Sequence, residues 1–271
     1  MKIGNREFDF TENAYVMGIL NVTPDSFSDG GRYNSVDAAV AHAVQMVEDG
    51  ADIIDIGAES TRPGHTHISA IDETARLLPA LRAVRKAVNV PISVDTYRAS
   101  VAAEALANGA DMINDIWGLT YDKALPGVLA HSGCPVCIMH NRKEDTYRNF
   151  FPEWLDEMRD RIHLAKDGGI RDESIIIDPG IGFAKHFPED TSAMLHLSDF
   201  CDLGYPVLLG VSRKRLIGSL TGLPVDERDE GTAAINVYGY LAGARIFRVH
   251  NVRTNRRMLD AVAHLKDTTH E

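Results

Sequence analysis

Short apolar runs recur along the chain and are separated by longer stretches of mixed polarity. The runs are rich in Val, Ile and Leu and show no clean alternation with polar residues. Continuous apolar strands are what a parallel sheet buried on both faces requires. We therefore predict strands at residues 16–22, 52–58, 91–95, 112–116, 135–140, 175–178, 206–211 and 245–250.

Helical patterns fill the stretches between these runs. Leu77, Leu81 and Val84, for example, fall on one stripe, as in a helix that packs one face on a core. Asp49-Gly50-Ala51-Asp52 and Asn108-Gly109-Ala110-Asp111 are nearly the same phrase, in which a glycine closes a helix and a strand follows. We predict helices at residues 36–49, 72–88, 98–108, 153–167, 227–242 and 254–265.

The repeated strand–helix unit predicts an α/β protein. We expect a single (β/α)₈ barrel, or TIM barrel, as one domain over residues 1–271. Residues 1–13 are expected to form a short N-terminal arm or hairpin across the bottom of this barrel. A doubly wound sheet is the alternative, but its glycine-rich dinucleotide loop is absent after the first strand, where the sequence reads Asn21-Val22-Thr23-Pro24-Asp25.

Composition narrows the possible partners. The chain is 44% hydrophobic and 25% charged, which is ordinary for a globular protein, and its net charge of −11 disfavours nucleic acid as a partner. No apolar run approaches the roughly 18 residues of a membrane span. Residues 1–10 mix charged and apolar side chains, unlike a signal peptide, so we expect no membrane partner and a cytoplasmic location. Cys134 and Cys137 form a C-x-x-C that leads into a strand, and we interpret them as small buried thiols.

Polar side chains occur where most of the predicted strands end. The carboxyl ends of barrel strands meet on one face, which is where barrel enzymes keep their active sites. Buried carboxylates at these positions are costly unless they are paired, so their recurrence predicts a polar pocket. The residues concerned include Asn21, Asp55, Asp95, Asn114, His140, Asp178, Ser212, Lys214, Arg248 and His250.

These residues divide into two chemical groups. Asp95, Asn114 and Asp178 can take a ligand edge that carries several N–H donors. A second group suits an oxyanion such as phosphate or pyrophosphate, with an amide oxygen as a possible magnesium ligand. This second group consists of Asn21, Arg62, Arg248 and His250. Two long loops, 23–34 and 59–71, are typical of lids that close over a site.

The motifs at these positions resemble the dihydropteroate synthase family. Two of the motifs, at residues 17–31 and 55–64, are too long to match by chance. All the motifs follow the family's order, from about residue 15 to residue 252. The motifs are Met17-Gly18-Ile19-Leu20-Asn21-Val22-Thr23-Pro24-Asp25-Ser26-Phe27-Ser28-Asp29-Gly30-Gly31, Asp55-Ile56-Gly57-Ala58-Glu59-Ser60-Thr61-Arg62-Pro63-Gly64, Ser93-Val94-Asp95-Thr96, Ile113-Asn114-Asp115-Ile116, Met139-His140, Asp178-Pro179-Gly180-Ile181-Gly182-Phe183, Ser212-Arg213-Lys214 and Arg248-Val249-His250.

The resemblance implies a (β/α)₈ barrel that is usually a homodimer. It implies condensation of 6-hydroxymethyl-7,8-dihydropterin diphosphate with 4-aminobenzoate to 7,8-dihydropteroate and pyrophosphate, a step of folate biosynthesis. In this family the diphosphate is thought to leave ahead of attack by the amine, and sulfonamides compete at the aminobenzoate site. The implied cofactor is Mg²⁺.

The resemblance also assigns roles to residues of this chain. It implies a catalytic set of Asp95, Lys214, Arg248 and His250. It implies a pterin set of Asp95, Asn114, Met139, Asp178, Lys214 and Arg248. The diphosphate would meet Asn21 with its Mg²⁺, Arg62, Arg248 and His250. The aminobenzoate would meet Phe27, Thr61, Arg62, Pro63 and Ser212.

Three positions depart from common family forms. Arg215 stands where many members have Ser, and Asn251 stands where Asp is frequent beside His250. Residues 186–191 lack the usual Asn-containing pattern and are expected to be the sixth helix with its lead-in. Two alternatives share parts of the pattern: a non-catalytic protein that binds pterin phosphate, and a methyltetrahydrofolate-dependent methyltransferase. The methyltransferase would have no use for the pyrophosphate group of residues.

Overall fold

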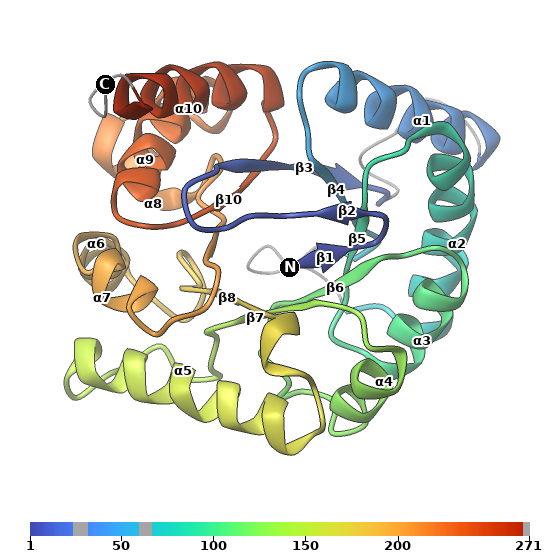
Figure 1. Cartoon of the computed structure of the whole chain (residues 1–271), viewed down its shortest axis with the longest axis horizontal. Helices are drawn as coiled ribbons and strands as arrows, with labels where there is room; N and C mark the ends of the chain where they lie inside the picture. Colours follow the sequence, from blue (N-terminus) through green and yellow to red (C-terminus); the bar gives the residue numbers. More distant parts are fainter. Residues whose placement is uncertain (24–31, 60–66, 268–271) are drawn as a thin grey trace.

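The computed structural model describes residues 1–23, 32–59 and 67–267. Within these ranges, eight parallel strands stand in the order β8-β7-β6-β5-β4-β3-β10-β9 (Figure 1). A parallel bridge between Ile177 and Val207 joins the two ends of this order, so the sheet closes into a barrel. The strands are β3 (Tyr15–Asn21), β4 (Ile53–Gly57), β5 (Ile92–Asp95), β6 (Met112–Asp115), β7 (Val136–Met139), β8 (Ile175–Asp178), β9 (Leu208–Leu209) and β10 (Ile246–Val249). All the predicted strands are confirmed, and so is the barrel.

Helices surround the strands on the outside of the barrel (Figure 1). The predicted ones are α1 (Arg32–Glu48), α2 (Ala70–Ala87), α3 (Ala99–Ala107), α5 (Phe150–Asp167), α9 (Asp229–Leu241) and α10 (Val252–Asp267). The helix expected at residues 186–191 is α6 (Phe187–Leu195). The remaining helices are α4 (Leu125–Ser132), α7 (Leu197–Cys201) and α8 (Arg215–Thr221), with short 3₁₀ turns at Asp172–Ser174 and Val225–Glu227. The α6 helix confirms the expected sixth helix. No helix in the described ranges is both long enough and apolar enough to cross a membrane.

Local sequence accounts for where the helices begin and end. Before α2, the hydroxyl of Ser69 accepts a hydrogen bond from Asp72 N at 3.1 Å, which satisfies a free amide of the first turn. The α4 helix was not predicted, because Pro126 and Gly127 interrupt its apolar pattern. Proline is tolerated in the first turn, and Gly133 ends the helix with a φ of +67°.

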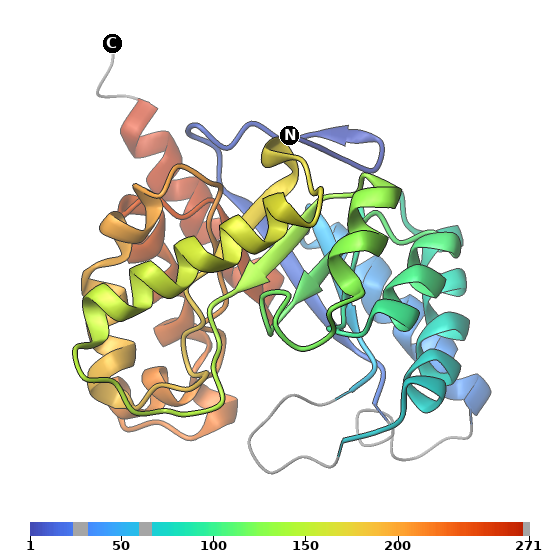
Figure 2. The same cartoon turned by 90° about the horizontal axis from the view of Figure 1, so that it is seen from below.

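The N-terminal segment closes one end of the barrel. Strands β1 (Lys2–Ile3) and β2 (Arg6–Glu7) form an antiparallel hairpin that lies across that end (Figures 1 and 2). Ile3 and Phe8 are buried there against the lowest ring of barrel side chains. That ring consists of Met17, Ile53, Met112, Cys137, Ile176, Leu208 and Ile246. The predicted hairpin across the barrel bottom is therefore confirmed.

The next inward-facing positions along the strands are largely polar. Side chains alternate between the two faces of a strand, so the residue two positions after an inward-facing one also faces inward. Two positions after Ile53 comes Asp55, after Met112 comes Asn114, and after Ile246 comes Arg248. The apolar ring thus closes the N-terminal end of the barrel. The polar residues of the barrel gather toward the C-terminal ends of the strands.

Candidate active site

Arg248 joins several strands inside the barrel. Its Nε donates to Asp55 Oδ2 at 2.6 Å, and its Nη2 donates to Asp95 Oδ2 at 3.0 Å. Asn114 Nδ2 donates to the same Asp55 oxygen at 3.3 Å. Strands β4, β5, β6 and β10 therefore contribute to one network. Asp55 was recognised in the sequence only as a strand-end polar residue, and the structure shows that it holds two of the candidate ligand-binding groups.

Asp178 and Lys214 both lie near Gly210 in the barrel, and the charge of Lys214 acts on Asp178. An ideal Cβ added to Gly210, just after β9, would lie 3.7 Å from Asp178 Oδ2 and 3.9 Å from Lys214 Nζ. Lys214 Nζ also donates to Ile181 O at 2.5 Å and lies 4.6 Å from the centre of the Phe183 ring. Because Gly210 has no side chain, its backbone leaves room beside both charged groups.

Burial strongly affects the charged groups of the site. It raises the pKa of Asp95 to about 7, against the opposing charge of Arg248. It also raises the pKa of Asp178, whose charge Lys214 supports, and lowers the pKa of Lys214 to about 8. Burial opposes the charge of Arg248, but Asp55 and Asp95 outweigh it and raise its pKa. Such shifts in a cleft are typical of functional sites.

Two oxygens in this network have no hydrogen-bond partner in the part of the chain that the structure describes. They are Asp55 Oδ1 and Asn114 Oδ1, and both are buried. A buried polar atom without a partner is costly, by about 1–3 kcal/mol each. Acceptors left open in this way are suited to a ligand that presents N–H groups, which matches the chemistry predicted for Asn114 and its neighbours.

An apolar wall stands beside these polar groups. Met139, at the end of β7, is buried and packs with Tyr97 and Ile116. Trp117 and Phe183 pack against the same cluster and remain partly accessible. Aromatic and thioether surfaces beside hydrogen-bonding groups suit a flat, polar ring system. Met139 therefore lies where a pocket-wall residue was predicted.

His140 does not share that wall. Its side chain is fully buried, and its Nε2 lies 3.1 Å from Glu157 Oε2 of α5, while its Nδ1 lies 2.9 Å from Lys185 Nζ. It follows Met139 directly in the strand and therefore faces the opposite side of the sheet. The sequence pattern predicted His140 among the polar residues of the pocket, but the structure shows it between β7 and α5 instead.

Ser212 and His250 are hydrogen-bonded to each other. His250 N donates to Ser212 Oγ at 3.1 Å, and Ser212 Oγ lies 2.9 Å from His250 Nδ1. The serine hydroxyl can donate to Nδ1, which places the proton of a neutral imidazole on Nε2. His250 can then offer an N–H donor to an anion.

Asn21 lies at the end of β3, close to Asp95. An ideal Cβ on Gly57 would be 3.6 Å from Asn21 Oδ1 and 3.6 Å from Asp95 Cβ. Within the described ranges, His, Cys, Asp and Glu form no group of three or more that could hold a metal ion. Mg²⁺ commonly binds through one or two protein oxygens together with substrate phosphates. The amide oxygen of Asn21 fits that arrangement as one of the protein oxygens.

The second long loop is anchored at its base. Arg98 donates to Glu59 Oε2 at 2.6 Å, to Ile68 O at 2.9 Å, and to Glu73 by a very short contact. Tyr97 OH donates to Glu59 Oε2 at 2.8 Å. Glu59 and Ile68 flank residues 60–66, so Arg98 ties the two flanks together. Sequence reasoning did not single out Arg98, although an arginine close after the polar end of β5 was a usable signal.

Several predicted residues lie outside the described ranges. These are Phe27, Thr61, Arg62 and Pro63, together with most of the two long loops. The other predicted site residues are described. Asn21, Asp95, Asn114, Met139, Asp178, Lys214 and Arg248 all lie in or at the end of the barrel strands or the loops that follow them, with Ser212 and His250 beside them.

The three departures from the family pattern have local explanations. Arg215 donates to Lys185 O at 2.7 Å, so its side chain is engaged with a neighbouring loop. Asn251 donates to Asp229 at 3.0 Å and accepts from Thr254 N at 3.1 Å, which caps the start of α10. In residues 186–191, the Glu189 carboxylate accepts from His186 N at 3.1 Å and caps α6.

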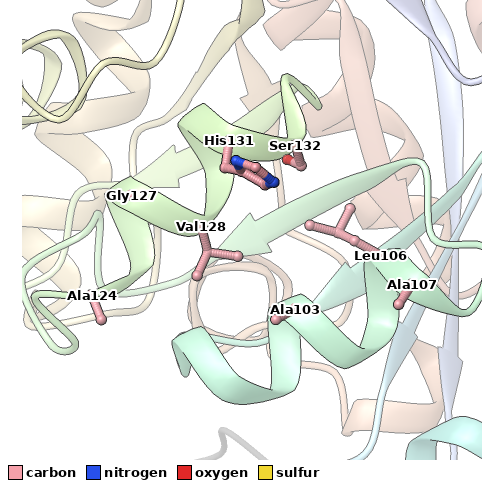
Figure 3. A pocket seen from close by; sticks show the side chains of 8 residues that line it. All are labelled: Ala103, Leu106, Ala107, Ala124, Gly127, Val128, His131 and Ser132. Atoms are coloured by element: carbon pink, nitrogen blue, oxygen red, sulfur yellow. The ribbon is translucent and has the colours of Figure 1, made fainter.

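A shallow groove between α3 and α4 is separate from this site (Figure 3). Its lining is mostly small and apolar, with no Asp, Glu, Lys or Arg. The lining residues are Ala103, Leu106, Ala107, Ala124, Gly127, Val128, His131 and Ser132. The chemistry therefore lies in the barrel and not in this groove.

Known proteins share both the sequence and the fold. The profile of the family described as pterin binding enzyme matches residues 17–250. A dihydropteroate synthase of Clostridium beijerinckii is 49% identical over 258 residues, covering 95% of this chain and 96% of the relative. The structure of dihydropteroate synthase from Clostridium difficile in the presence of pteroic acid aligns with a TM-score of 0.91 and 45% identity, over 94% of this chain and 99% of that one. The Xanthomonas albilineans dihydropteroate synthase with 4-aminobenzoic acid gives 0.90 and 39%, over 94% and 93%.

Proposed function

The chain belongs to the dihydropteroate synthases of the pterin-binding enzyme family, transferases of folate biosynthesis, and we propose how its barrel residues divide the work. The reaction condenses 6-hydroxymethyl-7,8-dihydropterin diphosphate with 4-aminobenzoate and releases pyrophosphate. The observation that carries the proposal is the buried network of Arg248, Asp55, Asp95 and Asn114, with its unpaired acceptors.

The pterin ring would occupy the inner part of the site. Asp178 would accept from the amino group and N3–H of the ring, since a carboxylate takes two parallel N–H bonds. Asn114 and Asp95 would hold the other ring nitrogens, and Lys214 would donate to the carbonyl side. Met139 would pack on the ring. The unpaired acceptors of Asp55 and Asn114, and the closeness of Asp178 and Lys214 to Gly210, support this placement.

The diphosphate would lie at the mouth of the barrel. Asn21, Arg248 and His250 would meet it, together with Arg62 from the second long loop. Cationic groups aimed at the leaving oxygens stabilise the charge that develops as the C–O bond breaks. When bound, Mg²⁺ would add positive charge at the same oxygens, with Asn21 as its protein ligand. The electron-rich pterin would stabilise the methylene cation, with Asp95 near the developing charge.

The aminobenzoate would approach from the loop side. Phe27, Thr61, Arg62 and Pro63 of the long loops would close over it, and Ser212 would receive its carboxylate at the start of α8. The hydrogen bond between Ser212 and His250 supports this assignment, because it holds the serine next to a residue that we propose to bind the diphosphate. No covalent nucleophile enters the scheme. The amine of 4-aminobenzoate attacks the pterin methylene carbon and loses its proton.

We propose that the chain is a single barrel domain. Its last helices offer a surface through which it would form a homodimer. Tyr238 and Leu241 on α9 are 42% and 61% exposed, and Leu220 on α8 and Val225 in the 3₁₀ turn after it are 51% and 52% exposed. Tyr240, on the same helix as Tyr238, is buried instead, and its hydroxyl donates to Glu12 O at 3.0 Å. Apolar side chains exposed together support a partner interface. The cytoplasmic location stays a prediction of the sequence.

A direct assay tests the function. The purified protein is incubated with pterin diphosphate, Mg²⁺ and 4-aminobenzoate, and pyrophosphate and dihydropteroate are measured. We expect equal amounts of both products. Pterin binding without product at any protein concentration would favour the non-catalytic alternative. Transfer of a methyl group from methyltetrahydrofolate would favour the methyltransferase instead.

The pKa of Lys214 predicts a pH dependence. Burial lowers this pKa to about 8, so the ammonium is charged below that pH and neutral above it. We expect kcat/KM for the pterin diphosphate to fall as the pH rises through about 8, since this ratio reports the ionisation of the free enzyme. In Lys214→Arg the guanidinium keeps its proton, so the fall should move to higher pH. Parallel pH profiles of both proteins check this, and an unmoved alkaline limb would contradict the assignment.

A further inference from the structure

A buried lysine lies in the loop between β8 and α6, outside the residues assigned above. Lys185 is 2% exposed. Its Nζ lies 3.0 Å from Gly180 O, 3.1 Å from Phe183 O and 2.9 Å from His140 Nδ1. Three acceptors match the three N–H bonds of an ammonium group. Burial of a lysine is rare and costly, so a lysine buried in this way is a candidate for a functional role.

The two carbonyl acceptors belong to the loop that forms one side of the pterin site. Gly180 N donates to Asp178 Oδ1 at 2.7 Å, and the aromatic ring of Phe183 packs against the ammonium group of Lys214. The loop has an unusual backbone, with positive φ at Gly180, Gly182 and Ala184. An added Cβ on Gly180 would come within 1.9 Å of His140 O, so the loop is pressed against β7. Lys185 bonds both ends of its central turn.

A chain of hydrogen bonds holds Lys185 from the other side. When the ammonium donates to His140 Nδ1, the imidazole proton must lie on Nε2, which then donates to Glu157 Oε2 at 3.1 Å. Burial lowers the pKa of His140 well below its usual value, as a neutral ring requires. Glu157 Oε1 in turn accepts from Arg142 at 3.0 Å. The ammonium, imidazole and carboxylate therefore form one directed chain from the loop to α5.

Burial lowers the pKa of Lys185 to about 7, so below that pH its ammonium charge also acts on Asp178. Burial raises the pKa of Asp178, and Lys214, Lys185 and Arg248 oppose that rise. The thiol of Cys137 is the neighbouring group on β7, and burial raises its pKa well above the usual value, so it stays neutral. Asp178 must be ionised to accept two N–H bonds from a ligand.

We propose that Lys185, held by His140 and Glu157, is a positioning residue of the pterin site. It fixes the loop that carries Asp178 and the Phe183 ring, and its charge keeps the Asp178 carboxylate ionised. This inference rests on the proposed function, because it takes Asp178 as the group that binds the pterin. Lys185 acts through Asp178 and its loop, so its effect should fall on pterin affinity and not on the aminobenzoate.

The test compares Lys185→Met with Glu157→Gln and with Lys166→Met, a control on α5 whose partner is the exposed Asp172. Calorimetry with 6-hydroxymethylpterin from pH 5 to 8 gives pterin affinity, and steady-state assays give the KM for 4-aminobenzoate. We expect Lys185→Met to bind the pterin at least tenfold more weakly. Glu157→Gln should lose affinity in the same direction by a smaller factor. The KM for 4-aminobenzoate should stay within twofold in both variants.

The pH dependence separates positioning from general damage. Acid abolishes pterin binding as Asp178 takes up a proton, and the midpoint of that loss should move to higher pH in Lys185→Met but not in Lys166→Met. Wild-type pterin affinity in Lys185→Met would overturn the inference. If that variant does not fold, unchanged pterin affinity in Glu157→Gln would overturn it. If the wild-type protein binds no pterin, the proposed function itself fails.

Discussion

Replacing Asp178 by alanine is expected to abolish measurable pterin binding. The carboxylate lies at the end of β8, is 5% exposed, and has its Oδ2 beside Gly210, 3.7 Å from where a Cβ on that glycine would lie. Hydrogen bonds to a charged group contribute about 1.5–3 kcal/mol each, so losing two of them weakens binding by about 10²- to 10⁴-fold. Calorimetry with 6-hydroxymethylpterin measures this loss directly.

A second substitution at this position separates recognition from folding. Asp178 Oδ1 accepts the bond from Gly180 N, and the amide oxygen of Asp178→Asn can still accept it. The amide nitrogen would then face the N–H donors of the pterin. Because this nitrogen is itself a donor, it cannot accept hydrogen bonds from them. We expect Asp178→Asn to keep the wild-type Tm and to lose pterin binding nearly as fully as Asp178→Ala. Asp199→Asn, at an exposed position on α7, is the matched control. Normal pterin affinity in either Asp178 variant would refute the assignment.

The strand pattern of the sequence was sufficient to predict the barrel, because buried parallel strands carry a strong apolar signal. The same pattern predicted where polar residues would meet, since the carboxyl ends of all strands share one face. Asp95, Asn114, Asp178 and Arg248 were found in this way, and they do lie together. The α4 helix was missed because its proline and glycine hide its period.

Side-chain pairing could not be predicted from position alone. The sequence pattern gave no sign that Asp55 and Arg248 pair, because 193 residues of chain separate them. In the structure they form a hydrogen bond of 2.6 Å. Strand register sets which of the inward-facing residues become neighbours, and register depends on the closure of the whole barrel. His140 was misplaced because its neighbour Met139 faces inward, and a shift of one residue reverses the face.

Lys185 illustrates a different limit. In the sequence it follows a glycine-rich turn and looks like an ordinary surface lysine at a helix start. Its burial depends on His140, which is 45 residues away in the chain. Local pattern therefore indicates the loop, while the long-range contacts decide which of its residues are buried and charged.

Arg248→Met is expected to lose both turnover and stability. The substitution removes a cation from the proposed diphosphate site, and we expect kcat to fall by about 10²- to 10³-fold, as for other groups that stabilise developing charge. Affinity should fall more for the pterin diphosphate than for 6-hydroxymethylpterin, because the free pterin has no phosphate for Arg248 to meet. Calorimetry with both ligands measures that difference.

The stability loss has a distinct pH signature. Arg248 is the ion-pair partner of both Asp55, which is fully buried, and Asp95. Breaking a buried pair by removing one partner typically costs about 3–5 kcal/mol, because a charge is left uncompensated. Burial already raises the pKa of Asp95 to about 7 with the arginine present, so its removal raises that pKa further.

A carboxyl group whose pKa is higher in the folded than in the unfolded protein destabilises the fold progressively as the pH rises between those two values. In Arg248→Met that interval runs from the usual carboxyl pKa of about 4 to above 7. The deficit in unfolding free energy, measured with urea, should therefore be larger at pH 8 than at pH 5. Arg253→Met, which loses only an exposed pair with Asp49, should show little deficit at either pH. An equal deficit for Arg248→Met at both pH values would mean that Arg248 contributes packing and not charge compensation, because the loss of the arginine would then leave the protonation of Asp95 between pH 5 and pH 8 unchanged.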